Sequence, residues 1–479
     1  MEDPMTLEIT HPTSRPAEIV DAAALRDLCD AEIHLPGEPG YDDARAPWAA
    51  SVDQRPAAVA YPRSAEEVSA LVRAAAVLGL RVAPQSTGHN AGPLAAQGLA
   101  DVVLVRLGRL DEITVDAERR VVRAGAGLVW EPVVEAAAEA GFTVLHGSSP
   151  DVGIAGYSLG GGSGWYARKL GLCTNNLVAV ELVDAQGRIL RADAEHHPDL
   201  FWAVRGGGGS FGVVTALELR MFDFATTYGG MLFWDVAHTE DVLRTWAAWA
   251  VDAPDEVTTS FRVLRVPPLP EVPEIVRGRD IVVIDGAVLA DDETARQILA
   301  PLRALEPEVD TFGRVPTREL IRLHMDPEGP TPVASSTAIL HSLPESAIAS
   351  VLEAVGPGAD TAIDLFELRQ LGGALGRPHP GGGATSHFEG TFLTLALGIA
   401  MTPERGARAH EEAHALTDTL APFANGRNYL NFAENPVDVA SFFSQDAWRR
   451  LTEVRATVDP SGLFVGNHPV PGAERESGS

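Results

Sequence analysis

The chain has 479 residues, of which 45% are hydrophobic and 22% charged, a balance typical of a globular protein with more than one domain. Its formal net charge is −29. Because a surface of that sign repels phosphate backbones and anionic lipids, nucleic acid and membrane surfaces are not expected as partners.

The cysteine content and the hydropathy of the sequence further restrict the class of protein and its expected compartment. The two cysteines, Cys29 and Cys173, are too few for a disulfide framework or a metal site. The acidic N-terminus lacks the apolar stretch of a signal peptide, and no run of about 18 apolar residues is found elsewhere. We therefore expect a cytoplasmic protein that does not span a membrane, with Cys173 as a buried thiol.

The first strong pattern follows a predicted leader, residues 1–39, that includes a short helix. The apolar run 57–62 predicts a strand. Ser64, with Glu67 three residues later, is a capping-box signature and predicts a helix start. A second strand is predicted at 81–85, so this stretch has the size of one βαβ unit.

The next block contains most of the glycine-dense segments. Residues 102–107 predict a strand and 130–141 a helix. A glycine-dense stretch covers 146–172, and 177–193 predicts a hairpin with a Gln-Gly turn. Residues 199–222 read as a glycine loop followed by an apolar strand.

The sequence changes in character after residue 222. In residues 223–424, apolar strands alternate with helices, which predicts an α+β domain. The loop 376–387 combines histidine, proline and glycine and is predicted to be a flexible lid. Residues 425–470 are compact and turn-rich, and 471–479 are predicted to be a disordered tail.

Three clusters have a composition suited to binding an extended cofactor: 84–90, 147–164 and 204–215. Small residues let backbone N–H groups approach an anionic group closely. Each cluster alone is equally typical of an ordinary loop. The third precedes a strand rather than a helix, so it is not a nicotinamide-dinucleotide fingerprint.

The order and spacing of the three clusters resemble the FAD-linked oxidases of the vanillyl-alcohol-oxidase superfamily, in the berberine-bridge-enzyme-like branch. The resemblance covers roughly 40–222 and 425–470. It implies an α+β fold in which these two segments form a split FAD-binding domain. Residues 223–424 would form the substrate domain, an antiparallel sheet backed by helices, with the flavin at the domain interface.

The histidine loop carries the most specific part of the resemblance. Family members have Arg-Ser-Gly-Gly-His, with the histidine bonded to the flavin 8α-methyl; this chain has Gln85-Ser86-Thr87-Gly88-His89. In the family's Gly-x-Cys-x-x-Val-Gly motif, Ser149 replaces the second linking cysteine. The resemblance thus implies one covalent link, through His89. The cofactor-binding residues that it implies are His89, Gln85, Ser86, Thr87, Gly88, Asn90, Ser149, Val152, Gly153, Tyr157, Gly161, Gly162, Gly209, Gly212, Val214, Asn431 and Asn467.

Some of these positions have family roles beside plainer alternatives. Val152 matches the position that gates dioxygen in relatives, or is an ordinary apolar loop residue. Tyr157 matches a histidine near the flavin pyrimidine edge, or simply packs. Tyr429, in Tyr-Leu-Asn, matches the family's general base, or only packs the substrate; its phenol, with an ordinary pKa near ~10, would need a lowered value to act near neutral pH. Phe432 stands where relatives have a second tyrosine.

The resemblance implies an FAD-linked oxidase that acts on an alcohol, a sugar or a secondary metabolite, with dioxygen as acceptor. A dehydrogenase of the same fold, an oxygenase or cyclase of secondary metabolism, and a flavin-binding protein without activity are the alternatives. His410 and His414 flank two glutamates in an HExxH pattern. No third ligand accompanies them, so we predict an exposed helix and no metal. The substrate and the oligomeric state are not written in the sequence.

Overall fold

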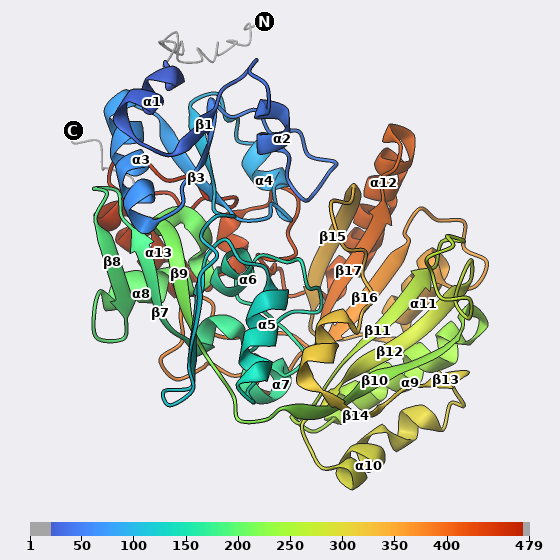
Figure 1. The fold of residues 1–479 in the computed structure, drawn as a ribbon. Coiled ribbons are helices and arrows are strands. Elements are labelled where there is room, and N and C mark those ends of the chain that lie inside the picture. The colour runs from blue at the N-terminus through green and yellow to red at the C-terminus, as the bar shows by residue number, and fades with distance from the viewer. Residues whose placement is uncertain (1–20, 473–479) are drawn as a thin grey trace, which may run out of the picture.

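The computed structural model of the protein describes residues 21–472, and it has a mixed helix-and-sheet architecture that confirms the predicted α+β class (Figure 1). The first 20 residues of the predicted leader and the tail from residue 473 lie outside the described residues. One half of the molecule holds a four-stranded and a five-stranded sheet, and the other half holds an eight-stranded sheet.

The four-stranded sheet contains the predicted βαβ unit. Its order is β1-β2-β4-β3, with β2, β4 and β3 parallel, so β4 lies between the two strands that the helix connects. Strand β1 lies in the segment predicted as a leader and pairs with β2. The bounds are β1 (Glu32–His34), β2 (Ala58–Tyr61), α3 (Ala65–Leu78), β3 (Arg81–Gln85) and β4 (Val102–Arg106). As predicted, Ser64 caps the helix, its Oγ accepting the Glu67 N–H at 3.3 Å.

The five-stranded sheet is antiparallel, in the order β5-β6-β9-β7-β8. The predicted hairpin is the pair β7 and β8, and the third glycine cluster leads into strand β9, as expected. The bounds are β5 (Ile113–Asp116), β6 (Val121–Gly125), α5 (Trp130–Glu139), α6 (Ile154–Leu159), α7 (Ala167–Leu170), β7 (Leu177–Val183), β8 (Ile189–Asp193), α8 (Pro198–Gly207) and β9 (Val213–Arg220).

The eight-stranded sheet is antiparallel, and helices α9, α10, α11 and α12 pack on one of its faces in a shared apolar core. Figure 1 shows it in yellow-green to orange. The bounds are β10 (Thr226–Asp235), α9 (Thr239–Asp252), β11 (Val257–Arg265), β12 (Asp280–Val288), α10 (Asp292–Arg303), β13 (Val309–Asp310), β14 (Gly313–Pro316), β15 (Val333–Leu340), α11 (Glu345–Val355), β16 (Leu365–Gln370), β17 (Phe392–Ile399) and α12 (Pro403–Leu420).

Successive side chains along β11 and β16 point to opposite faces of this sheet. Phe261 and Phe366 are buried in the core with the helices. Arg262 and Glu367, one position further along each strand, line a cavity on the opposite face. The period-two pattern of a strand therefore gives the sheet an apolar face for packing and a second face for a site.

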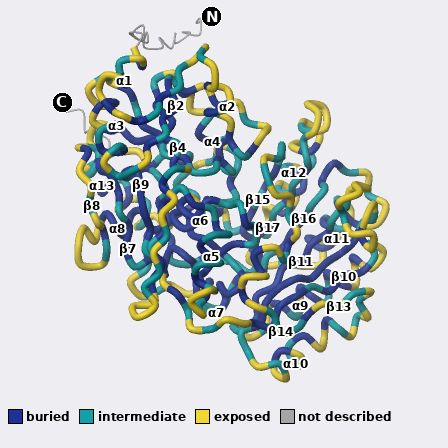
Figure 2. The backbone as a smooth tube through the Cα atoms, in the orientation of Figure 1, coloured by how far each residue is buried: buried dark blue, intermediate teal, exposed yellow. Residues whose placement is uncertain are grey.

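The C-terminal segment returns to the first half of the molecule. Helix α13 (Gln445–Val458) packs against α8, and the residues after it lie beside β3. There Val82 N–H donates to Leu463 O, and Val465 N–H donates to Val82 O, each at 2.8 Å. Figure 2 shows buried backbone running through both halves, with exposure concentrated on the outer loops. The remaining helices are α1 (Leu25–Leu28), α2 (Tyr41–Arg45) and α4 (Gly92–Ala95).

Candidate functional site

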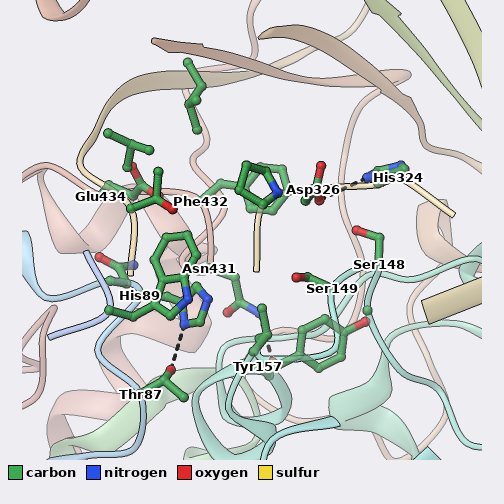
Figure 3. Close-up of a pocket in the computed structure, with 18 of the residues that line it drawn as sticks. Thr87, His89, Ser148, Ser149, Tyr157, His324, Asp326, Asn431, Phe432 and Glu434 are labelled. Carbon is green, nitrogen blue, oxygen red and sulfur yellow. Dashed lines mark hydrogen bonds and ion pairs between the residues drawn. The ribbon is translucent and has the colours of Figure 1, made fainter. Parts of the chain in front are cut away.

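A cavity of about 1050 Å³ lies between the first half of the molecule and the free face of the eight-stranded sheet (Figure 3). Sixteen of the eighteen predicted site residues line it. These are Gln85, Ser86, Thr87, Gly88, His89, Asn90, Ser149, Val152, Gly153, Tyr157, Gly209, Gly212, Val214, Tyr429, Asn431 and Asn467. Gly161 and Gly162 do not line it; they lie behind Tyr429, where a Cβ on Gly161 would meet the Tyr429 ring at 3.1 Å.

The loop after β3 holds His89 in one orientation. The His89 ring stacks on Trp48, with the ring centroids 4.0 Å apart and an interplanar angle of 15°. Its Nδ1 forms a hydrogen bond of 2.7 Å with Thr87 Oγ1. Gly88 has φ +84°, and a Cβ there would lie 2.8 Å from Pro47 Cβ. Only glycine suits that position, so the backbone fixes where the histidine points.

A positive charge near this loop comes from the neighbouring strand. Gln85, at the position where relatives more often have arginine, exchanges hydrogen bonds with Gln54 and contacts the Arg106 guanidinium. Arg106 ends β4 and is the direct partner of Gln85 in the parallel register. Burial lowers the pKa of Arg106 from its ordinary value. A positive charge therefore lies beside Gln85, on its paired residue in the neighbouring strand.

Several residues that line the cavity, His89 among them, carry polar atoms without partners. Five of them are buried without a hydrogen bond to any residue in the range 21–472. They are Ser86 Oγ, His89 Nε2, Asn90 Oδ1, Tyr157 OH and Asn431 Oδ1. Buried polar atoms are normally paired, so a set of this kind is typical of a site for a polar ligand. This lining fits a cofactor rich in hydrogen-bonding groups.

Glycine lets the backbone pack closely beside these cavity-lining residues. A Cβ on Gly153 would lie 2.6 Å from Ser86 Oγ, and one on Gly162 would lie 2.5 Å from Tyr157 Cε1. The second and first clusters therefore touch, although Ser86 and Gly153 are 67 positions apart in the sequence. Asn431 Nδ2 donates to Tyr157 O at 2.9 Å, which ties the C-terminal segment to the same lining.

Tyr429 is buried, 2% exposed, and its hydroxyl accepts two backbone N–H bonds, from Gly162 and Ser163, each at 3.0 Å. Burial raises the pKa of Tyr429 to about 12, while the two N–H donors and the charge of Arg369 oppose the rise. The lowered pKa that a base near neutral pH needs is therefore absent in the structure. The phenolate is favoured by the two N–H donors of the glycine segment and by the positive charge of Arg369, whereas Phe432 offers no hydrogen bond.

Arg369 belongs to a charged wall on the opposite side of the cavity that the sequence reasoning missed. Its guanidinium lies 4.8 Å from the Phe432 ring, and its Nε donates to Glu367 Oε1 at 2.9 Å. Arg262 donates to Asp285 at 3.2 Å and to Asp326 at 3.0 Å. The alternation of charges in the apolar strand 365–370 was the available signal.

His324 joins the acidic groups of this wall. Its Nδ1 lies 3.6 Å from Asp326 Oδ2, and its Nε2 lies 3.5 Å from Asp285 and 3.6 Å from Glu367 (Figure 3). Burial alone would lower the pKa of His324, but the surrounding carboxylates raise it overall. The same contacts hold the pKa of Asp326 well below its usual range despite burial. The wall is therefore a network of opposite charges paired with one another.

Glu434 is an acid of the cavity that has no cationic partner among residues 21–472. Its carboxylate accepts a hydrogen bond of 2.5 Å from Ser335 Oγ. Burial raises the pKa of Glu434 to about 7. Near neutral pH this carboxyl group is therefore present in both forms, unlike the paired acids opposite.

Aliphatic side chains line the rest of the cavity. They come from the segment around the β11–β12 connection and from the ends of β16 and β17. The set is Leu264, Val266, Leu269, Val272, Val276, Ile281, Leu365, Leu395, Leu397 and Ile399. The cavity is thus polar beside His89 and Arg369 and mainly apolar elsewhere, where Arg265, Glu271 and Asp364 lie among the aliphatic side chains.

Two predicted features lie away from this site. None of the residues 376–387 lines the cavity, so their predicted role as its lid is wrong. Asn175 holds that loop, donating to Ser386 O at 2.8 Å and accepting from Gly383 N at 3.3 Å. His410 and His414 lie on helix α12, as predicted, and His410 is exposed.

Cys173 is buried, and burial raises the pKa of its thiol to about 12. No helix within residues 21–472 has the length and apolar character to cross a membrane.

Comparison with known proteins identifies the cofactor half. Residues 56–193 match the family model described as an FAD binding domain. (R)-6-hydroxynicotine oxidase of Paenarthrobacter nicotinovorans is 34% identical over 192 residues, 40% of this chain and 42% of that protein. Glucooligosaccharide oxidase of Sarocladium strictum is 30% identical over 224 residues, 46% of this chain and 45% of that protein. The match thus spans less than half the length of these curated relatives.

Solved structures match over nearly the whole chain. BBE-like 1 of Physcomitrella patens aligns with a TM-score of 0.82 and 22% identity, covering 94% of this chain and 98% of that one. A 6-hydroxy-D-nicotine oxidase of Arthrobacter nicotinovorans aligns with a TM-score of 0.79 and 23% identity, covering 92% and 97%. The chain therefore contains an FAD binding domain and has the same overall fold as BBE-like 1 and 6-hydroxy-D-nicotine oxidase, in agreement with the predicted resemblance.

Proposed function

We propose that the protein is an FAD-dependent oxidoreductase that carries its flavin on His89, oxidises a small organic substrate and passes the electrons to dioxygen. The observation that supports this most is the cavity itself. It brings His89, Tyr429 and several unpaired polar atoms to one site, at the junction of the matched FAD binding domain and the eight-stranded sheet. Sites for cofactors and substrates are concentrated at such junctions.

The chain's own residues would hold and orient the cofactor. Backbone made accessible by glycine, Asn90, Asn431 and Tyr157 offers hydrogen-bonding groups without partners inside the protein. Bound FAD would supply the redox chemistry, taking two electrons from the substrate and delivering them to an acceptor. A single link through His89 follows from Ser149, because a hydroxyl cannot replace a thiolate in forming a second link.

Tyr429 would handle the substrate proton. Because its oxygen accepts two backbone N–H bonds, its own hydrogen is left to point elsewhere, and the residue lines the cavity. In its phenolate form the same oxygen can take a proton from a substrate O–H or N–H group. With a pKa raised to about 12, the phenolate population increases with pH throughout the range in which enzymes are assayed.

The lining of the cavity favours a substrate with an apolar body and one polar end. The aliphatic side chains from Leu264 to Ile399 offer few hydrogen bonds to a chain of sugar hydroxyls, whereas they suit a hydrocarbon or heterocyclic skeleton. The charged wall near Arg369 and Asp326 suits the hydroxyl or amine that is oxidised. A secondary metabolite or cyclic amine therefore fits the cavity better than an oligosaccharide does.

Anaerobic bleaching of the bound flavin tests this proposal. The purified protein would be mixed, without oxygen, with a panel of sugars, alcohols, cyclic amines and phenolic metabolites. We expect bleaching by an apolar alcohol or amine and none by sugars. Bleaching by oligosaccharides alone would contradict the proposed substrate class.

Admission of air would then separate the acceptors. Rapid return of the yellow colour with formation of hydrogen peroxide is expected for an oxidase with dioxygen reaching the flavin past Val152. Slow return would identify a dehydrogenase, and incorporation of oxygen into the product would identify an oxygenase. Purified protein without any flavin would refute the proposal as a whole.

A further inference from the structure

Asp151 stands at the centre of a set of contacts around His89. Its Oδ2 accepts the Trp48 indole N–H at 2.6 Å and the Gly329 backbone N–H at 2.8 Å. Its Oδ1 accepts the Ser149 hydroxyl at 2.9 Å and lies 3.8 Å from His89 Nε2. Three separate segments of the chain thus fix this carboxylate, with one oxygen facing the imidazole.

The carboxylate is ionised throughout the ordinary pH range. Burial alone would raise the pKa of Asp151, but the neighbouring His89, the Gly329 N–H and the Trp48 N–H hold it well below its usual value. Trp48 contributes twice, since it stacks on the His89 ring and also donates to Asp151. The arrangement therefore presents a fixed negative charge to a fixed histidine.

We infer that Asp151 is a positioning residue that promotes the covalent attachment of FAD to His89. This inference rests on the proposed link at His89 and adds the group that drives it. In that step a bond forms between a ring nitrogen of His89 and the 8α carbon of FAD, while one C–H bond of the methyl group and one N–H bond of the histidine are broken. The two electrons released reduce the isoalloxazine ring and pass to dioxygen, which takes up both protons as hydrogen peroxide.

The physical role of Asp151 follows from the charge that develops on the imidazole. When one ring nitrogen bonds to carbon, the other still carries a proton, so the ring becomes positive until that proton is shared or lost. A carboxylate 3.8 Å away in a partly buried site stabilises the positive ring more than water does. The same contact holds the ring in position before the bond forms.

The substitution Asp151→Asn isolates this role. The amide oxygen can keep the bonds from Trp48 and Gly329, while the NH₂ group replaces the oxygen that faces His89. Apoprotein of each variant would be mixed with FAD in air. Flavin fluorescence retained by acid-denatured protein, followed in time, measures the covalent link, and titration measures reversible FAD binding.

We expect Asp151→Asn to form the covalent link about 10- to 100-fold more slowly than the wild type, because the charge facing the ring is lost, with reversible FAD binding nearly unchanged. Asp199→Asn removes an exposed carboxylate whose partner is Arg450, outside the cavity, and serves as the matched control with a wild-type rate. Asp151→Glu and Asp151→Gln form a second pair of variants, whose new side chains have equal size. The charged variant, Asp151→Glu, should form the covalent link faster than Asp151→Gln.

The outcomes separate this inference from the proposal beneath it. Covalent flavin in His89→Ala would overturn the link at His89 itself. Loss of the link in His89→Ala together with a wild-type rate in Asp151→Asn would overturn the role of Asp151 and leave the link intact. Should Asp151→Asn fail to fold, equal rates in the Glu and Gln variants would have the same meaning.

Discussion

Removal of the Tyr429 hydroxyl tests the proposed chemistry at one atom. In Tyr429→Phe the two backbone N–H groups of Gly162 and Ser163 lose their acceptor. A buried donor left unpaired costs about 1–3 kcal/mol, and water from the adjacent cavity can replace part of the loss. We therefore expect stability to fall by about 2 kcal/mol, which urea denaturation would measure.

The effect on activity should be larger and should depend on pH. General base catalysis contributes about 10²- to 10⁴-fold, so anaerobic flavin reduction by substrate should slow by that factor in Tyr429→Phe. Burial raises the pKa of Tyr429 to about 12. Below that value, each pH unit changes the phenolate fraction about tenfold, so the wild-type rate should climb between pH 7 and 9 while the variant's rate stays flat.

Stopped-flow reduction under nitrogen is the assay, with Tyr166→Phe as the matched control. The Tyr166 hydroxyl is buried, has no hydrogen-bond partner within residues 21–472 and does not line the cavity, so its loss should change neither stability nor rate appreciably. A Tyr429→Phe variant that keeps the wild-type pH slope would refute Tyr429 as the base and leave it as a packing residue.

Three further substitutions test other parts of the cavity. Burial raises the pKa of Glu434 to about 7, so its contribution to stability is lost as pH rises from its ordinary value through 7; Glu434→Gln should flatten the change in Tm between pH 5 and 8. Val152→Leu should slow reoxidation in air about tenfold by crowding, without slowing anaerobic reduction. Arg262→Met removes the guanidinium partner of the buried Asp285 and leaves it His324 at 3.5 Å, so the loss in urea denaturation should be about 3 kcal/mol, the low end for breaking a buried pair. An unchanged pH slope, reoxidation rate or unfolding free energy would contradict the respective prediction.

The cofactor half could be predicted from the sequence because its contacts depend on local backbone. Glycine is required at positions 88 and 153 because a side chain there would collide with neighbouring atoms. Such requirements produce short, recognisable motifs in the sequence. His89 lies at the end of one motif and lines the cavity, as expected. Gly161 and Gly162 do not line the cavity, so their assignment to the cofactor stays a prediction.

The charged wall could not be predicted in the same way. Arg262, His324 and Glu367 come from different segments of the second half. Only the folded chain places Asp285 3.2 Å from Arg262 and 3.5 Å from His324, and Glu367 3.6 Å from His324. Helix α13 was also missed, although Ser444 caps it by accepting the Ala447 N–H. Long-range pairing leaves no fixed spacing in the chain, so single-sequence reasoning finds the residue types without their neighbours.

The return of residues 463–465 to β3 has a consequence for how the protein is made. The strand that leads into the His89 loop receives its outer hydrogen bonds from almost the last described part of the chain. Tyr429 and Asn431 complete the cavity from the same late region. A nascent chain thus lacks a finished cavity until residues 429–465 have left the ribosome and folded back onto β3. If His89 carries the flavin as proposed, its attachment follows that step, and a chain that stops before residue 429 should yield a colourless protein.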